Sequence, residues 1–165
     1  MAFTVISNSF KDGDYLPNDF ILSANFGFGC AGGNRSPHLT WSGAPAGTKS
    51  FAVTCYDPDA PTGSASGTGW WSTSRRMWAS SPKVRAARAA GCRRARCRTR
   101  TNFGAPGSGG PCPPEGDHPH RYLFTVFAVK TDKLDVKADT SAAVVGFNLH
   151  FNTLAKTEIM GLFKR

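Results

Sequence analysis

The stretch Lys49-Ser50-Phe51-Ala52-Val53-Thr54-Cys55-Tyr56 runs directly into Asp57-Pro58-Asp59-Ala60-Pro61-Thr62. The first half alternates between apolar and polar residues well enough to predict a β-strand. In the second half, prolines fix the backbone φ angle on either side of Asp59, which predicts a rigid polar loop. Because rigid loops at strand ends often carry binding sites, this loop is the first candidate for a functional site.

A second polar loop, residues 109–121, precedes another apolar run. It reads Gly-Gly-Pro-Cys-Pro-Pro-Glu-Gly-Asp-His-Pro-His-Arg. The run that follows, residues 122–129, is apolar except for Thr125 and is the strongest strand candidate in the chain. A strand that is apolar on both faces is expected in the middle of a sheet.

The composition of the chain favours a loop-rich β protein. Its 165 residues include 18 glycines and 11 prolines, and 12% are aromatic. This length suits one domain with its own core, and we find no internal repeat or linker. Further short strands are expected at residues 3–6 and 20–22.

One helix is expected near the C-terminus. Asp139, Thr140 and Ser141 are all residue types that cap helix N-termini. Apolar residues then recur at spacings of three and four, which predicts one apolar helix face formed by Val144, Phe147, Phe151 and Leu154. Residues 157–163 fit either a last strand or a helical tail.

The cysteines point to a reducing compartment. Five cysteines at irregular spacing make a disulfide framework an unfavoured interpretation, so we expect a cytoplasmic protein. The start of the chain lacks the basic and long apolar regions of a signal peptide, and no apolar run is long enough to span a membrane. The spacing of Cys92, Cys97 and Cys112 matches no common zinc pattern, so no metal is expected. Cys30 and Cys112 are expected to be structural, and Cys55 to be a buried small apolar residue.

The positive charge is confined to one segment. Residues 72–100 contain nine arginines, one lysine and no acidic residue, whereas the formal net charge of the whole chain is +9. The other 136 residues therefore sum to −1. A strongly basic chain usually suggests affinity for nucleic acid. Here such an affinity would come from residues 72–100 alone.

Several motifs in order resemble the phosphatidylethanolamine-binding protein family, and in particular its bacterial Raf-kinase-inhibitor-like branch. The resemblance covers roughly residues 2–71 and 99–165. It rests on Asn34-x-Ser36-Pro37-x-Leu39-x-Trp41, Tyr56-Asp57-Pro58-Asp59-Ala60-Pro61, Gly69-Trp70-Trp71, Arg100-Thr101-Asn102-Phe103-Gly104, residues 109–114, His120-Arg121-Tyr122 and Val145-Gly146-Phe147-Asn148-Leu149-His150-Phe151.

The resemblance implies a mainly β fold. It is an antiparallel β-sandwich of Greek-key type, with one or two short helices near the C-terminus. It also implies a pocket for a small anion, such as phosphate or a phospholipid headgroup, in a protein without catalytic activity or a cofactor. Family members are linked to inhibition of a partner kinase or protease, and bacterial relatives resemble homodimers.

By position, ten residues match that pocket. They are Asp57, Pro58, Asp59, Pro61, Trp70, Gly109, Gly110, Pro113, His120 and Tyr122. We expect His120 and Tyr122 to donate hydrogen bonds to the anion and the two glycines to offer backbone N–H groups. The carboxylates would repel a bare phosphate, so they are expected to shape the loop or to accept from histidine or a headgroup amine.

Residues 72–98 depart from the family pattern. A second pocket histidine usually follows the tryptophan pair, where this chain has Ser72. Our hypothesis is a pair of compensating frameshifts in the gene. With suitable codons, one shifted frame encodes His-Phe directly after Trp71 and Leu-Pro-Ala-Gly-Ala-Val-Gln directly before Thr99. As printed, the arginine-rich segment is expected to be disordered or irregular, because unpaired arginines are almost never buried.

Two alternative functions belong to other classes. A nucleic-acid binder would use residues 72–100, and its affinity would fall steeply with salt. A hydrolase would use Asp57, Asp59 and His120 as acid–base groups, and it would turn over an ester.

Overall fold

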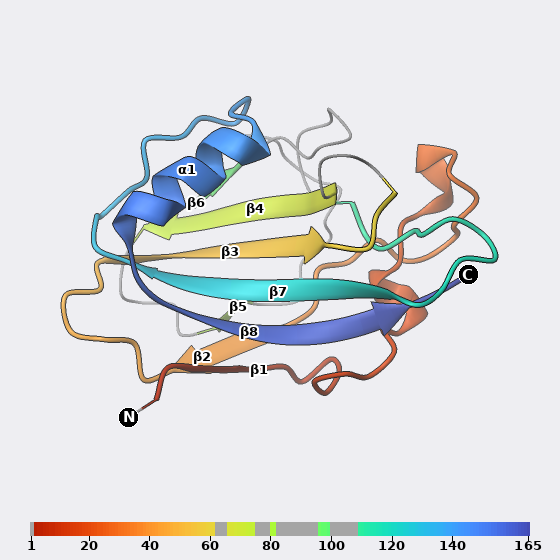
Figure 1. Cartoon of the computed structure of the whole chain (residues 1–165), viewed down its shortest axis with the longest axis horizontal. Coiled ribbons are helices and arrows are strands. Elements are labelled where there is room, and N and C mark those ends of the chain that lie inside the picture. The colour runs from red at the N-terminus through yellow and green to blue at the C-terminus, as the bar shows by residue number, and fades with distance from the viewer. Residues whose placement is uncertain (1, 62–65, 75–79, 82–95, 100–108) are drawn as a thin grey trace.

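The computed structural model describes residues 2–61, 66–74, 80–81, 96–99 and 109–165, with the backbone alone for residues 66–74, 80–81 and 96–98. These residues form a mainly β structure with two antiparallel sheets (Figure 1). The prediction of a mainly β protein is confirmed, whereas the Greek-key connection stays a prediction.

The larger sheet has five strands in the order β6-β4-β3-β7-β8. Their bounds are β3 Ser50–Asp57, β4 Ser66–Ser74, β6 Arg96–Arg98, β7 His120–Val129 and β8 Thr153–Phe163. The two strands predicted most strongly, β3 and β7, pair with each other along most of their length, from Ser50 opposite Val129 to Tyr56 opposite Leu123. Each also has a second partner, β4 and β8 respectively, so both are internal strands.

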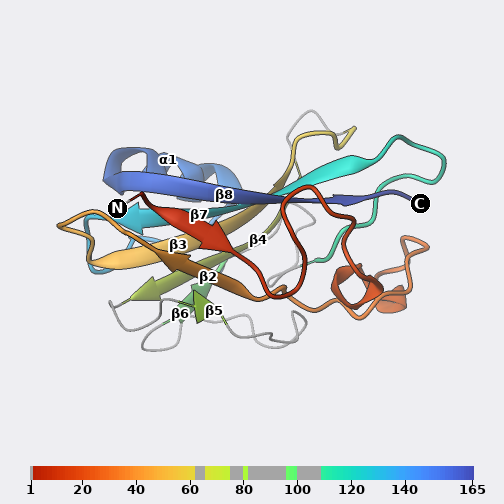
Figure 2. The same ribbon diagram turned by 90° about the horizontal axis from the view of Figure 1, so that it is seen from below.

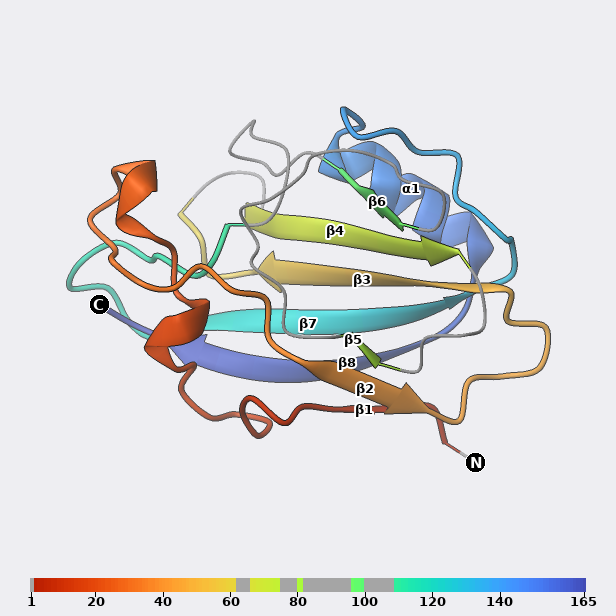
Figure 3. The ribbon, with the colours of Figure 1, turned by 180° about the vertical axis from the view of Figure 1, so that it is seen from behind.

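The smaller sheet has the order β1-β2-β5, with β1 Thr4–Ile6, β2 Leu39–Ser42 and β5 Ser80–Ser81. It lies against one face of the larger sheet, and the helix lies on the opposite face (Figure 2). The view from behind shows β1 and β2 in front of the larger sheet and the helix beyond it (Figure 3).

The main core fills the space between the two sheets. The residues on alternate positions of β7 point into it, as the two-residue period of a strand requires. These residues, Tyr122, Phe124, Val126 and Ala128, pack with Leu39 and Trp41 of β2 and with Phe51 and Cys55 of β3. Burial of this apolar surface from both sheets is the main source of stability for the fold.

Helix α1, Ala142–Asn152, begins where the capping residues predicted it. Ser141 is the N-cap, and its hydroxyl accepts from the Val144 N–H at 3.5 Å. Val145 and Leu149 are the buried helix residues, and they form a second core with Ala52, Val129, Leu134 and Val136.

The predicted apolar face of the helix was wrong. The side chains of Val144, Phe147, Phe151 and Leu154 are between 43% and 66% exposed. Leu154 is not helical, because β8 begins at Thr153, so the last residue of the predicted face belongs to a strand. The last residues therefore form a strand rather than a helical tail.

The short strand predicted at residues 20–22 is replaced by the end of one 3₁₀ turn, η1 Asn18–Phe20, and the segment that leads to a second, η2 Ala24–Phe26. Phe20, Ile21 and Leu22 are buried as that pattern suggested, but no strand forms there. These apolar residues anchor a loop in the core instead of forming a strand. A pattern of three residues cannot distinguish these two cases.

The arginine-rich segment is more regular than its composition suggested. Residues 72–74 belong to β4, residues 80–81 form β5, and residues 96–98 form β6, which pairs with β4 from Trp71 opposite Arg98 to Thr73 opposite Arg96. Backbone pairing explains this difference, since it needs no apolar side chain. Residues 75–79 and 82–95, on which the rest of the expectation falls, lie outside the described residues.

Candidate functional site

The last residue of β3 and the first residue of β7 bring an acid and a histidine together. Because the two strands are antiparallel neighbours, the end of β3 lies beside the start of β7. The Nδ1 atom of His120 is 2.9 Å from the Oδ2 atom of Asp57, and both side chains are buried. This pairing joins residues 63 positions apart, and it holds the imidazole ring in one orientation.

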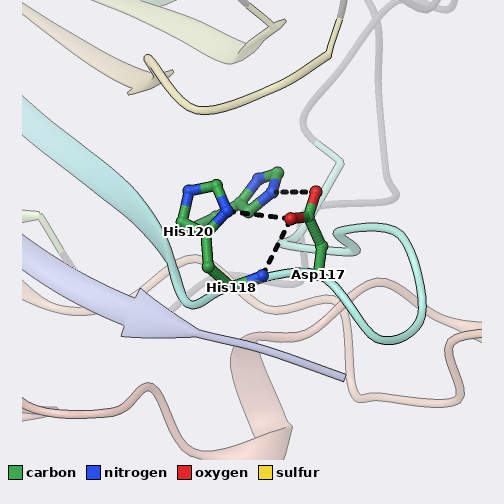
Figure 4. Close-up of side chains that lie close together, drawn as sticks. All are labelled: Asp117, His118 and His120. Atoms are coloured by element: carbon green, nitrogen blue, oxygen red, sulfur yellow. Dashed lines mark hydrogen bonds and ion pairs between the residues drawn. The ribbon is translucent and has the colours of Figure 1, made fainter.

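The second nitrogen of His120 faces another carboxylate. Its Nε2 atom is 3.3 Å from Oδ2 of Asp117, and the other oxygen of Asp117 is 2.8 Å from Nδ1 of His118. Figure 4 shows both imidazole rings turned toward this carboxylate. The burial of the three side chains is graded, from His120 at 1% exposed through Asp117 at 34% to His118 at 61%. The cluster therefore opens to solvent on the His118 side.

Carboxylates on both sides favour the protonated imidazole. Burial alone lowers the pKa of His120, but the hydrogen bonds to Asp57 and Asp117 outweigh it, so the pKa lies above its usual value. The hydrogen bonds from His118, and then that from His120, hold the pKa of the Asp117 carboxyl below its usual value. The two carboxylates thus favour the protonated, cationic form of a buried imidazole.

A tight turn sets the position of Asp117. The Asp117 N–H donates to the Pro114 carbonyl at 3.4 Å, and Gly116 has a φ of 80°, as the third residue of a type II turn requires. The Gly116 N–H donates to the carbonyl of Arg165 at 3.2 Å, so the C-terminal residue holds this loop in place.

The Asp57-Pro58-Asp59 loop is fixed by its own carboxylates. Oδ1 of Asp57 accepts from the Asp59 N–H at 2.9 Å, which is the closure of an Asx turn. Asp59 does not face His120, because it pairs with Arg121 instead. Side-chain hydrogen bonds from Arg121 lower the pKa of Asp59 to about 2. Pro58 is half-buried in this loop, and Pro61 is exposed at its end.

Tyr122 lies beside the Asp57–His120 pair, on the face of β7 that points into the main core. Its side chain is 1% exposed, and its hydroxyl meets no partner in hydrogen-bond geometry within the described part of the chain. Burial, and then the nearby Asp57 charge, raise the pKa of Tyr122. Pro113 is buried in the loop that precedes the strand.

The expectation that Gly110 offers a free backbone donor was wrong. Its N–H donates to Oδ1 of Asn34 at 2.7 Å. A Cβ atom at Gly110 would collide with the backbone of Phe20 and Leu22, so close packing is the reason for glycine here. Gly109 is buried next to it. Gly110 therefore has a packing role in this turn, and its N–H is not available to a ligand.

The prediction against disulfides was also wrong, since Cys30 and Cys112 form one. The bond ties the loop before Asn34 to the loop that leads to the cluster. Cysteine spacing in the sequence did not indicate this pair, because only the fold brings the two cysteines together across a separation of 82 residues. Cys55 is not part of a disulfide and is buried, as expected.

Two predicted pocket positions lie on β4. Trp70 is opposite Thr54, and its side chain lies outside the described residues. Ser72, the position of the expected second histidine, is opposite Ala52, whereas Asp57 at the site is opposite Ser66. In this register position 72 is six residues along β4 from the strand end that faces Asp57.

The comparisons with known proteins agree with this architecture. The family model described as phosphatidylethanolamine-binding protein matches residues 6–164. The chain belongs to the phosphatidylethanolamine-binding protein family. Its relatives include two proteins of Escherichia coli K12, YbcL and YbhB. YbcL is 46% identical over 99% of this chain and 88% of its own length, and YbhB is 44% identical over 96% and 98%.

Solved structures of the phosphatidylethanolamine-binding protein family show the same fold. The crystal structure of Escherichia coli YbcL superposes with a TM-score of 0.90 at 44% identity, covering 100% of this chain and 99% of that one. A putative homologue from Chlamydia trachomatis, at 21% identity, gives a TM-score of 0.80 over 99% and 98% of the two chains. No helix among the residues that the structure describes is long and apolar enough to cross a membrane.

Three residues of this site were not assigned a role from the sequence. Asp117, His118 and Arg121 were not among the ten residues matched to the pocket. The spacing Asp-His-x-His was the available signal, because alternate residues of an extended segment point the same way.

Proposed function

We propose that this family member binds a small anion at His120, as a phosphate or as the phosphorylated part of a headgroup. The observation that carries the proposal is the position of His120, which is buried between two carboxylates and turns Nε2 toward a solvent-exposed loop. A buried imidazolium is a strong donor to an anion, since hydrogen bonds between charged partners are about twice as strong as neutral ones.

Asp57 and Asp117 have different roles in this proposal. Asp57 is buried and stays hydrogen-bonded to Nδ1 of His120, so the ring keeps its orientation while a ligand binds. Asp117 is more exposed, and its bond to Nε2, at 3.3 Å, is the longer of the two. An anionic oxygen of the ligand would take the place of the Asp117 oxygen on Nε2. The Tyr122 hydroxyl, which lies close to Asp57, is a second candidate donor.

The surrounding acids favour a ligand that carries both signs of charge. Asp117 would repel a bare dianion, but once released from His120 it would attract an ammonium group. Phosphoethanolamine has a phosphate and an ammonium two carbons apart, so it suits a histidine beside a carboxylate better than inorganic phosphate does. We therefore expect phosphoethanolamine to bind more tightly than phosphate.

Calorimetric titration of the full chain with phosphoethanolamine tests the proposal. The variant is His120→Gln, and the matched control is His150→Gln, since His150 is exposed on α1. We expect the His120 variant to bind about tenfold to a hundredfold more weakly, as for loss of one charged hydrogen bond. Because His120 is buried, thermal unfolding of each variant is measured first. A folded His120 variant with unchanged affinity would overturn the proposal.

Other expectations from the family stay predictions. They are modulation of a partner kinase or protease, a homodimer, a cytoplasmic location and the lack of catalytic activity. Sedimentation at several concentrations tests the dimer, and an ester panel tests for catalysis.

A further inference from the structure

The geometry points to a transition-metal site formed by Asp117, His118 and His120, independent of whether the chain binds an anion. Taking one ligand atom from each side chain, the three atoms all lie within 4.8 Å of one another. Among the residues that the structure describes, these form the group that can offer a metal two imidazole nitrogens and one carboxylate oxygen.

Two contacts of the cluster, each to a different oxygen of Asp117, are near the ligand separations of a bound site. In a tetrahedral zinc centre the ligand atoms lie about 2.0–2.2 Å from the metal, so neighbouring ligands are about 3.3 Å apart. Here one carboxylate oxygen is 2.8 Å from Nδ1 of His118, and the other is 3.3 Å from Nε2 of His120. A metal would need the two imidazole nitrogens to approach each other, and the exposed His118 ring has room to move.

The buried side of the cluster has the support that metal-binding histidines usually have. Metal-bound histidines commonly donate their second nitrogen to a carboxylate, which fixes the tautomer and the direction of the ring. Asp57 provides this carboxylate at 2.9 Å from Nδ1 of His120. Its other oxygen is held by the Asp59 N–H, so the support is itself fixed.

The charges around His120 also favour a cation. Carboxylates of Asp57 and Asp117 lie beside the two ring nitrogens of His120, so the surroundings of the cluster are negative and attract a cation. Arg121 does not neutralise these two carboxylates through an ion pair, because its guanidinium is paired with Asp59.

The donor set selects the class of metal. Two imidazoles and a carboxylate suit Zn²⁺, Co²⁺, Ni²⁺ or Cu²⁺, whereas Mg²⁺ and Ca²⁺ prefer oxygen ligands. Three protein ligands leave a fourth position for water or an oxygen of a ligand, as in open zinc sites. The expectation of no metal came from cysteine spacing and did not consider this cluster.

The test is titration of the metal-free full chain with Co²⁺ and Zn²⁺, followed by calorimetry and by the visible absorption of Co²⁺. The variants are His118→Ala and Asp117→Asn, both of which change exposed or half-exposed side chains and should leave the fold intact. His150→Ala is the control for a surface histidine, and Mg²⁺ is the control for the metal. The series is repeated in a Cys92→Ser/Cys97→Ser background, because thiols also bind these metals.

We expect one equivalent of Co²⁺ or Zn²⁺ to bind in the Cys92→Ser/Cys97→Ser background, with affinity at least tenfold lower in either cluster variant and unchanged in the control. Broadening of the imidazole NMR signals of His118 and His120 by Co²⁺ gives a second, local readout. The inference is overturned if the wild-type chain binds no metal, or if both cluster variants bind as tightly as the control. Because no anion is present, this result is separate from the outcome for phosphoethanolamine.

Discussion

Arg121 donates two side-chain hydrogen bonds to Asp59. Its Nη2 atom is 2.7 Å from Oδ1, and its Nε atom is 3.0 Å from Oδ2. The backbone N–H of Arg121 also donates to Oδ2 at 2.8 Å. These hydrogen bonds hold the loop after β3 against the start of β7, at the residue that follows His120. Two-pronged pairs of this kind are more specific in geometry than single surface contacts.

Replacing Asp59 by asparagine should lower the thermal midpoint by a few degrees near neutral pH. The pKa of Asp59 is lowered to about 2, below the ordinary value for an aspartate, so its ion pair stabilises the fold above about pH 4. That stabilisation is lost as the pH falls toward 2. The difference between wild type and Asp59→Asn should therefore be constant from about pH 5 to 7 and shrink below about pH 4.

The matched control for this pair is Asp19→Asn. Asp19 meets Arg35 through one contact of 3.2 Å, and both side chains are about half exposed. We expect almost no change in midpoint for this variant. Equal effects of the two substitutions, measured by thermal unfolding across the pH range, would contradict the special role of Asp59.

The helix offers a second comparison, between Leu149 and Phe147. Leu149 is 3% exposed in the core below α1, whereas Phe147 is 66% exposed. We expect Leu149→Ala to lower the free energy of unfolding by about 2–4 kcal/mol, as for other buried leucines. Phe147→Ala should change it by less than about 0.5 kcal/mol, as for a surface site. Urea unfolding of both variants checks this, and a large loss for Phe147→Ala would show that its face is covered in solution.

Helix α1 also shows where prediction from sequence stops. The run Asp139-Thr140-Ser141 located its start, with Ser141 as the actual N-cap, because capping depends on neighbouring residues alone. The apolar spacing of Val144, Phe147 and Phe151 selected the wrong face, because Val145 and Leu149 face the sheet. Periodicity reports which residues share a side of a helix, but the contact with the sheet decides which side is buried.

At the site, too, some features could be predicted from the sequence and others could not. Motif resemblance located Asp57, His120 and Tyr122, which the fold brings together at one end of the larger sheet. It gave Gly110 the role of a donor, because the partner of its N–H, Asn34, is 76 positions away in the chain. Contacts of such long range depend on the whole fold, and no local pattern records them.

The Cys30–Cys112 bond leads to a prediction about stability. The bond closes a loop between residues 82 positions apart, so it restricts the unfolded chain strongly. Replacing both cysteines by serine should lower the free energy of unfolding by about 3 kcal/mol. Denaturant unfolding with and without reductant provides the measurement, and the double variant should be insensitive to reductant.

The same bond allows a direct test of the expected compartment. Disulfides persist in oxidising compartments and are rare in a reducing cytoplasm. Peptide mapping of the protein isolated from its own cells under acid quench, without reductant, would find the linked peptide if the bond forms there. Free thiols at both positions would support the cytoplasmic expectation.

The arginine-rich segment gives the last prediction, which concerns affinity for polyanions. Residues 72–100 contain ten basic side chains and no acidic one, so the chain as printed should bind heparin or single-stranded DNA. The affinity should fall steeply as salt rises, since binding releases counterions, and it should not depend on nucleotide sequence. A chain with Leu-Pro-Ala-Gly-Ala-Val-Gln in place of residues 92–98, and His-Phe after Trp71, has four fewer arginines and should bind more weakly with a smaller salt slope. Resequencing the gene and measuring peptide masses across residues 70–101 decides which chain the cell makes. If those masses match the arginine run and binding proves sequence-specific, both the frameshift hypothesis and the non-specific interpretation are wrong.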